Sequence, residues 1–392
     1  MVKVRHQPLF NRRYLLILIW ILPIVILVLH RSGQTQSPLD QLSWQNDSGY
    51  LLPNTEPGYR LTLILPSTNA LSDEGWVQDQ AVERALRTRL DAAQTWLDQQ
   101  QWRADLHRSG SYLALRLRMQ AQPKPVQQQQ LLSLLAPLPA LDWPALTRRL
   151  RAERYLQSQP AEDRLLAAFG QQLEPSSDIG TAYSRLWQPP HRWILVGDVE
   201  IPEQTTSPSQ ADRYDRSGWQ SGELLIPDTG SSRLDTGWQL IAQSIPAPTN
   251  GVELARQRLS AELVSHLLAR TLAANADYRW LWQPLVSGGY HGLLLHNWPD
   301  DPSAMGEQLA RHLDQALLDT TRDTLLQQLA RIEQESPGQW LDLVALYRLP
   351  LDSHKAFRDT LTTLNLAQAR QLLRDTLRPA QSLLIRFDTA GH

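Results

Sequence analysis

The chain of 392 residues contains no cysteine, which excludes disulfides, thiolate metal sites, cysteine nucleophiles and lipid-modified cysteines. Lysine is scarce as well, since only Lys3, Lys124 and Lys355 occur, so arginine carries almost all of the positive charge. The 38 basic and 40 acidic residues give a formal net charge of −2. Because this balance offers no basic footprint for a nucleic acid, we expect no nucleic-acid partner.

The sequence also lacks the local motifs of several enzyme classes. It has no Gly-x-Ser-x-Gly nucleophile turn and no glycine-rich phosphate loop. None of the ten histidines forms a His-x-x-x-His pair with an intervening glutamate, the spacing that places two zinc ligands on one helix face. His291 and His296 stand on one predicted strand at a spacing that puts them on opposite faces. We therefore expect no metal and no other cofactor.

The first feature that is present is a basic segment followed by a long apolar run. Residues 1–13 carry four positive charges, and residues 14–29 are apolar throughout. About 20 apolar residues span a bilayer, and no small-residue cleavage site follows this run. We predict an uncleaved signal anchor over residues 14–30 with residues 1–13 in the cytoplasm, a cleaved signal peptide being the alternative. Residues 31–57, rich in Gln, Ser, Pro and Asn, predict a flexible stalk.

Beyond the stalk, the same order of elements is predicted twice. The first half gives a strand at 59–66, a long helix at 77–99, a strand at 111–119 and further helices to residue 169. The second half gives a strand at 237–245, a helix at 251–273, a strand pair at 279–297, further helices and a final strand at 382–387. Strands set apart from helices in two rounds favour an α+β fold of two related domains. Each would have a mainly antiparallel sheet with helices packed on one face.

A short apolar run lies between the two halves. Trp193–Val196 is apolar, follows Pro189 and Pro190, and ends at Gly197–Asp198. A run of this length between turn residues predicts a buried strand. We expect this strand to open the second domain, so that residues 58–190 form the first domain and residues 191–392 the second.

The stretch Trp193–Ile–Leu–Val–Gly–Asp–Val199 resembles the strand that opens the second domain of pitrilysin/insulinase-type (M16) peptidases. The order of the other elements is similar to that family over about residues 50–392. The resemblance implies an M16 peptidase-like fold preceded by one transmembrane helix. Together with the anchor and the arginine bias, it implies a bacterial inner-membrane protein with a single pass and a periplasmic C-terminal part.

Enzymes of this family bind zinc through a His-x-x-Glu-His motif on the first long helix. Two histidines one turn apart hold the metal, and the glutamate activates its water. If Gly75 is matched to the glycine that precedes the motif, the ligand and base positions fall on Gln78, Ala81 and Val82. None of the three can bind zinc or act as a base, and residues 70–106 contain no histidine for another register. The resemblance therefore implies a non-catalytic member of the family.

The second-domain signature of the family is also eroded. Active members contribute an arginine and a tyrosine to the substrate cleft from this region, and the matching arginine position here holds Leu272. Tyr278 stands within one residue of the expected tyrosine. We take Tyr278, Trp282 and Trp298 as candidate contacts to a cleft or a partner. Packing on the core is the plainer expectation for these aromatic side chains.

These observations predict a membrane-anchored, catalytically inactive M16-like subunit. The resemblance implies pairing with a catalytic M16-type peptidase and a part in binding extended polypeptide, physically by addition of the peptide to a sheet edge. Two alternatives remain open. One is an active metallopeptidase with dispersed ligands such as His107, His266 or His291, and the other is a structural envelope assembly factor without a peptide cleft.

Overall fold

The computed structural model describes residues 37–45, 49–54, 57–67, 71–158, 160–173, 177–199, 220–227, 237–272, 277–286, 289–298 and 302–388. The predicted basic segment at 1–13 and the predicted anchor at 14–30 lie outside these residues. Within the described ranges, no helix combines the length and the apolar character that a membrane crossing requires.

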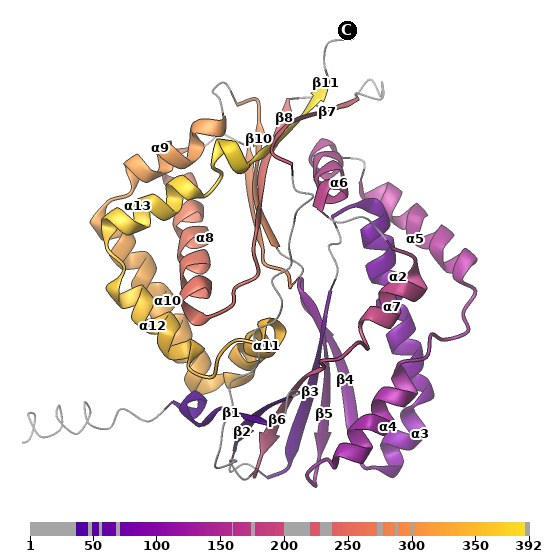
Figure 1. The fold of residues 1–392 in the computed structure, drawn as a ribbon. Helices are drawn as coiled ribbons and strands as arrows, with labels where there is room; N and C mark the ends of the chain where they lie inside the picture. Colours follow the sequence, from indigo (N-terminus) through magenta and orange to yellow (C-terminus); the bar gives the residue numbers. More distant parts are fainter. Residues whose placement is uncertain are drawn as a thin grey trace, which may run out of the picture.

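Two sheets form the centre of the molecule, one beyond the other along its long direction (Figure 1). Sheet A contains β1 (Ser43–Gln45), β2 (Gly49–Pro53), β3 (Tyr59–Pro66), β4 (Arg103–Arg108), β5 (Tyr112–Met119) and β6 (Arg192–Gly197). Sheet B contains β7 (Gly222–Pro227), β8 (Trp238–Ile245), β9 (Tyr278–Gln283), β10 (Gly289–His296) and β11 (Leu383–Asp388).

The two sheets share one topology. The strand order is β1-β2-β6-β3-β5-β4 in sheet A and β7-β11-β8-β10-β9 in sheet B, so without β1 the orders correspond strand for strand. In each sheet one pair is parallel, β2 with β6 and β7 with β11, and the other pairs are antiparallel. The α+β fold with two related halves is thus confirmed, but the sheets are mixed.

The helices of the first half are α2 (Asp73–Ala92), α3 (Gln94–Gln99), α4 (Pro125–Leu135), α5 (Trp143–Gln157), α6 (Ala161–Leu173) and α7 (Ile179–Arg185). Those of the second half are α8 (Gly251–Thr271), α9 (Met305–His312), α10 (Gln315–Glu335), α11 (Pro337–Tyr347), α12 (Ser353–Thr363) and α13 (Leu366–Asp375). Short 3-10 turns lie at η1 (Pro38–Gln41), η2 (Pro302–Ala304) and η3 (Pro379–Gln381).

The long helices α2 and α8 hold equivalent places, each directly after a central strand. Each begins at a side-chain cap: Ser72 Oγ accepts a hydrogen bond from the Gly75 N–H, and Asn250 Oδ1 accepts one from the Glu253 N–H. Such caps satisfy amides that have no partner within the helix. The two caps therefore fix where both long helices begin.

Two of our domain boundaries were wrong. The expected strand around Trp193 is β6, and it belongs to sheet A, where it pairs with β2 and β3. It closes the first half instead of opening the second, as β11 closes sheet B. The described part of the expected stalk at 31–57 is also structured, because η1, β1 and β2 lie there and bury Leu39, Trp44 and Tyr50.

Each half also sends one helix to the sheet of the other half, so helices cover both faces of each sheet. Helix α6 packs on β8 and β11 of sheet B, where Phe169 is fully buried and meets the Tyr290 ring edge-to-face at 5.5 Å. Gly170 permits this position, because a Cβ there would lie 2.3 Å from the Ser72 backbone nitrogen. In exchange, α11 packs on β2, β3 and β6 of sheet A. We had expected helices on only one face of each sheet.

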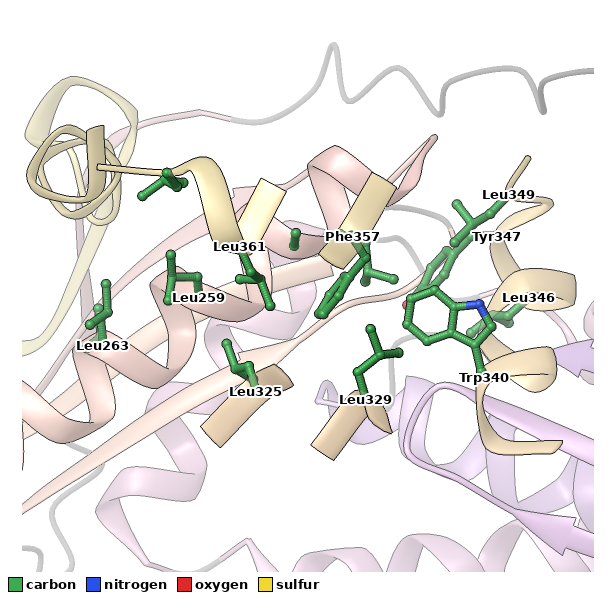
Figure 2. Packing of buried hydrophobic residues seen from close by; sticks show 14 of the residues in the cluster. Leu259, Leu263, Leu325, Leu329, Trp340, Leu346, Tyr347, Leu349, Phe357 and Leu361 are labelled. Carbon is green, nitrogen blue, oxygen red and sulfur yellow. The ribbon is translucent and has the colours of Figure 1, made fainter. Parts of the chain in front are cut away.

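The halves consequently share one large apolar core. Its members come from the α11-facing side of sheet A, from sheet B and from the helices α8 to α13. Figure 2 shows the region where α8, α10, α11 and α12 come together, with Leu259, Leu329, Trp340 and Phe357 as members of this core from the four helices. The Tyr50 hydroxyl adds a hydrogen bond of 2.7 Å to the Leu349 carbonyl, which ties β2 to the end of α11. A second apolar cluster lies on the other face of sheet A, against α2 and α4.

Candidate functional site

The three positions matched to the zinc motif lie on the buried side of α2. Gln78, Ala81 and Val82 are 5%, 0% and 6% exposed. The Gln78 amide donates to the Ser177 hydroxyl at 3.0 Å, while Ala81 and Val82 pack in two apolar clusters. These side chains offer no metal ligand, and the polar one already has a partner.

The neighbouring polar residues of α2 are held by an arginine from β4. The Arg108 guanidinium forms ion pairs with Asp79 and with Glu83, two carboxylates one turn apart on the helix. The Asp79 side chain is only 5% exposed, and burial lowers the pKa of Arg108. A guanidinium supplies charge and a fixed fork of donors to both carboxylates. This cluster therefore fastens edge strand β4 to α2.

The three histidines of the metallopeptidase alternative lie in different surroundings. His107 is exposed on β4, His266 on α8 contacts the Thr321 hydroxyl at 3.1 Å, and His291 is buried in β10. Burial lowers the pKa of His291 to about 3, and its Nε2 accepts the Leu377 N–H at 3.3 Å. Over the ranges that the structure describes, no group of three or more His, Asp or Glu residues is arranged to hold a metal.

The three aromatic candidates do not form one site. Tyr278 begins edge strand β9 and packs half-buried against the large core, as does Trp298 just after β10. Trp298 lines a hollow of about 540 Å³ at the outer end of sheet B. Trp282, near the other end of β9, lines a different hollow at the junction of the two halves. Of the three, only Trp282 faces a space shared by both halves.

This junction hollow, of about 620 Å³, is built by four parts of the chain. They are the β4–β5 turn, α8, the end of β9 and α11, and they contribute His107, Ser111, Arg258, Trp282, Asp342 and Tyr347 among others. The Ser111 hydroxyl donates to the Pro284 carbonyl at 2.8 Å and accepts from the Gln283 amide at 2.8 Å. These bonds join the β4–β5 turn to the end of β9.

Some polar groups of the junction hollow have hydrogen-bond or ion-pair partners, and others do not. Asp342 of α11 accepts from the Tyr112 hydroxyl at 3.0 Å and from Arg116 at 2.9 Å. Burial raises the pKa of Asp342, and Arg116 opposes that shift. The Arg258 guanidinium lies over the Trp282 ring at 5.0 Å, and the buried Tyr347 hydroxyl has no hydrogen-bond partner among the described residues. The hollow is thus lined by a cation on an aromatic face and by a carboxylate held by a tyrosine and an arginine.

Edge strand β4 connects this hollow with a second one. On the face of sheet A that α11 partly covers, β4 presents Arg103, Asp105 and His107, all exposed. His107 lines the junction hollow, and Arg103 lines a hollow of about 600 Å³ at the far end of the strand. The two residues are about 13 Å apart at the usual rise of a strand. A peptide strand lying along β4 would run from one hollow to the other.

Comparison with solved structures identifies the fold, whereas comparison by sequence does not. By sequence, no family model and no curated protein matches the chain. By structure, it is similar to the inactive domain of an M16 peptidase from Pseudomonas fluorescens, with TM-score 0.53, 12% identity and coverage of 88% of this chain and 97% of that one. The fold is that of M16 peptidases.

Two further solved proteases are similar to this chain at the same level. A protease from Helicobacter pylori is similar with TM-score 0.53 and 13% identity, covering 88% of this chain and 98% of the other. The ferredoxin protease FusC, solved with Arabidopsis ferredoxin, is similar with TM-score 0.53 and 12% identity, but this chain spans only 45% of it. At these identities the neighbours establish the M16-like fold.

Sequence reasoning missed most of this site. The pairing of Arg108 with α2 had a weak signal, since Asp79 and Glu83 are one turn apart and face the strand pair that follows. The junction hollow had none, because its walls come from segments that are separated by more than a hundred residues, such as Tyr112 and Asp342.

Proposed function

We propose that this chain is a non-catalytic M16-like subunit that holds extended polypeptide. The observation that carries the proposal is the state of α2 in an M16-like fold. The positions matched to the metal motif are buried and without ligands, and the adjacent carboxylates are taken up by Arg108. A helix arranged in this way fastens a strand and does not activate water.

Polypeptide binding is supported by the edge of sheet A. Strand β4 is the last of the described strands in its sheet, so one row of its backbone amides and carbonyls has no partner strand among them. An extended peptide can add to such an edge through main-chain hydrogen bonds, with side-chain pockets supplying selectivity. The hollows at the two ends of β4 provide such pockets.

The proposal also includes a cellular location and a partner protein. The N-terminal run at residues 14–30 would anchor the chain in the bacterial inner membrane with its folded part in the periplasm. A catalytic M16-type peptidase would supply the metal chemistry that this chain lacks. One neighbour in the comparisons is an inactive M16 domain, which agrees with a division of roles between chains.

The test begins with peptide binding by the full-length chain, purified in non-ionic detergent. Terminally blocked extended peptides would be titrated by fluorescence anisotropy, in two versions N-methylated on alternate amides. A strand presents one edge to β4, so one version should lose binding by about tenfold or more and the other should keep it. Equal binding of both methylated versions would contradict edge addition.

The partner is tested by capture from native membranes through an affinity tag on the same chain. We expect a chelator-sensitive peptidase activity in the captured fraction and an M16 peptidase among its proteins. Capture of envelope-assembly proteins without peptidase activity would favour the structural alternative. Chelator-sensitive cleavage by the chain alone would favour the metallopeptidase alternative.

A further inference from the structure

Three arginines stand side by side on sheet A in direct cross-strand register. Arg60 on β3 pairs with Arg118 on β5, and Arg118 pairs with Arg103 on β4. Residues paired in this way project from the same face of a sheet, and adjacent strands are about 4.8 Å apart. The three guanidinium groups therefore start from a row about 10 Å long, which we call the arginine row.

The arginine row is unusual because no carboxylate of the described residues forms an ion pair with it. Like charges directly across a strand pair destabilise a sheet. All three side chains are exposed, and within the described ranges none of them forms an ion pair. The nearby arginines of the same half behave differently, since Arg108 and Arg116 each pair with a carboxylate.

The surroundings of the row are concave and nearly free of acidic groups. All three arginines line the hollow of about 600 Å³, together with Tyr59, Trp102, Gln101 and Gln120. One carboxylate, Asp98, also lines it, and its Oδ1 accepts a hydrogen bond from Gln94 at 2.7 Å. Asp105 follows on the same face of β4, toward Arg116. Among the lining residues that the structure describes, three cations therefore stand against one carboxylate.

We infer that the arginine row binds carboxylates of an acidic polypeptide segment. This inference rests on the proposed function, and it adds the charge class of the polypeptide. A peptide strand beside β4 would place one side chain next to Arg103, in line with the row. The row runs across the strands and the peptide would run along them, so one acidic side chain of the peptide would extend the row beyond Arg103. Arginine forks bind carboxylates through paired hydrogen bonds.

The selectivity should change along β4. Beside Arg103 the edge favours an acidic side chain, whereas beside Asp105 it disfavours one. The preferred polypeptide therefore carries its acidic residues at the end that lies over the arginine row. Its other end reaches the junction hollow near His107.

The experiment compares two blocked peptides that differ only in charge, one alternating Glu with Thr and one alternating Gln with Thr. Each is titrated by fluorescence anisotropy into the full-length chain in non-ionic detergent, at low and at raised salt. Variants are Arg118→Gln, the centre of the row, and Arg149→Gln on α5, an exposed arginine elsewhere, as the matched control. We expect the Glu peptide to bind about tenfold tighter at low salt, and Arg118→Gln alone to remove that preference.

A second readout separates a binding role from a structural one. Because Arg118 is flanked by two like charges, Arg118→Gln should keep or raise the melting temperature. A fall of several degrees would show that the row is structural and would overturn the inference.

The remaining outcomes distinguish this inference from the function on which it rests. Equal binding of both peptides, unaffected by Arg118→Gln, would overturn the acidic preference and leave polypeptide binding standing. Binding of neither peptide would contradict both. If only inorganic pyrophosphate raised the melting temperature in an Arg118-dependent way, the row would be a small-anion site and the polypeptide would be the wrong occupant.

Discussion

In each half an arginine joins the long helix to the edge strand, but it comes from the strand in the first half and from the helix in the second. In the first half, Arg108 on edge strand β4 pairs with two carboxylates of α2. In the second half, Arg258 on α8 lies over the ring of Trp282 on the equivalent edge strand β9. The buried side of α2 thus keeps polar residues, whereas that of α8 is almost entirely apolar. One topology therefore supports two different ways of fastening a long helix to an edge strand.

The exchange of α6 and α11 between the halves gives the largest expected effect. Phe169→Ala removes a fully buried ring between α6 and sheet B, so the free energy of unfolding should fall by about 3–5 kcal/mol. Leu156→Ala on α5, where the side chain is 74% exposed, is the control and should change it by less than about 0.5 kcal/mol. Denaturant unfolding followed by tryptophan fluorescence measures both. A small effect of Phe169→Ala would mean that α6 does not support sheet B.

The second-largest effect on the free energy of unfolding should come from the cluster that Arg108 forms with α2. Arg108→Leu leaves the nearly buried Asp79 without its cation, while Glu83 keeps its pair with Arg87, and we expect a loss of about 3 kcal/mol in the free energy of unfolding. On α8, Arg270→Leu breaks an exposed pair with Asp314 and should cost less than about 1 kcal/mol. Adding Asp79→Leu to Arg108→Leu should recover part of the loss. Equal costs for the two single arginine variants would remove the contrast between the helices.

The buried histidine of sheet B should make stability depend on pH. The unfolded chain binds a proton at His291 below about pH 6.5, but the folded chain does so only near pH 3, because burial lowers the pKa to about 3. Stability is therefore lost as the pH falls through about 6.5, by about 2 kcal/mol at pH 5. Urea unfolding of His291→Leu should lack this loss, whereas His312→Gln on α9 is the exposed control. The same slope in His291→Leu would assign the pH dependence elsewhere.

The contact between Arg258 and Trp282 should be the smallest effect. A cation over an indole ring contributes about 1 kcal/mol at a partly exposed place. A double-mutant cycle with Arg258→Met and Trp282→Leu isolates this coupling from the packing that each change disturbs. Additive single effects would show that the ring and the guanidinium only share a hollow.

The sequence predicted what depends on local pattern. The strands at β3, β5, β8 and β11 and the long helices α2 and α8 follow from apolar spacing and turn residues. The expected stalk was wrong because its Gln-, Ser- and Asn-rich composition outweighed the short apolar run Tyr50–Leu52, whose parallel partner β6 comes more than a hundred residues later. The boundary at residue 190 was wrong for the same reason, since the strand around Trp193 gives no local sign of the sheet to which it belongs.

For the candidate site too, some features could be predicted from the sequence and others could not. The absence of histidine from α2 is visible in the sequence, and so is the i, i+4 spacing of Asp79 and Glu83. The arginine row is not visible, because Arg60, Arg103 and Arg118 become neighbours only through the register of three strands. Tyr278 and Trp298 are partly buried and pack against the large core, which is what we expected of aromatic side chains in general. Their roles as contacts stay predictions.

The central claim is that α2 fastens a strand and supports no metal chemistry. The most direct measurement is the zinc content of the purified full-length chain after equilibration with Zn²⁺, together with its cleavage of extended peptides. The account predicts less than stoichiometric zinc and no cleavage that a chelator abolishes. One zinc ion per chain with chelator-sensitive cleavage would contradict it and would place the ligands outside α2.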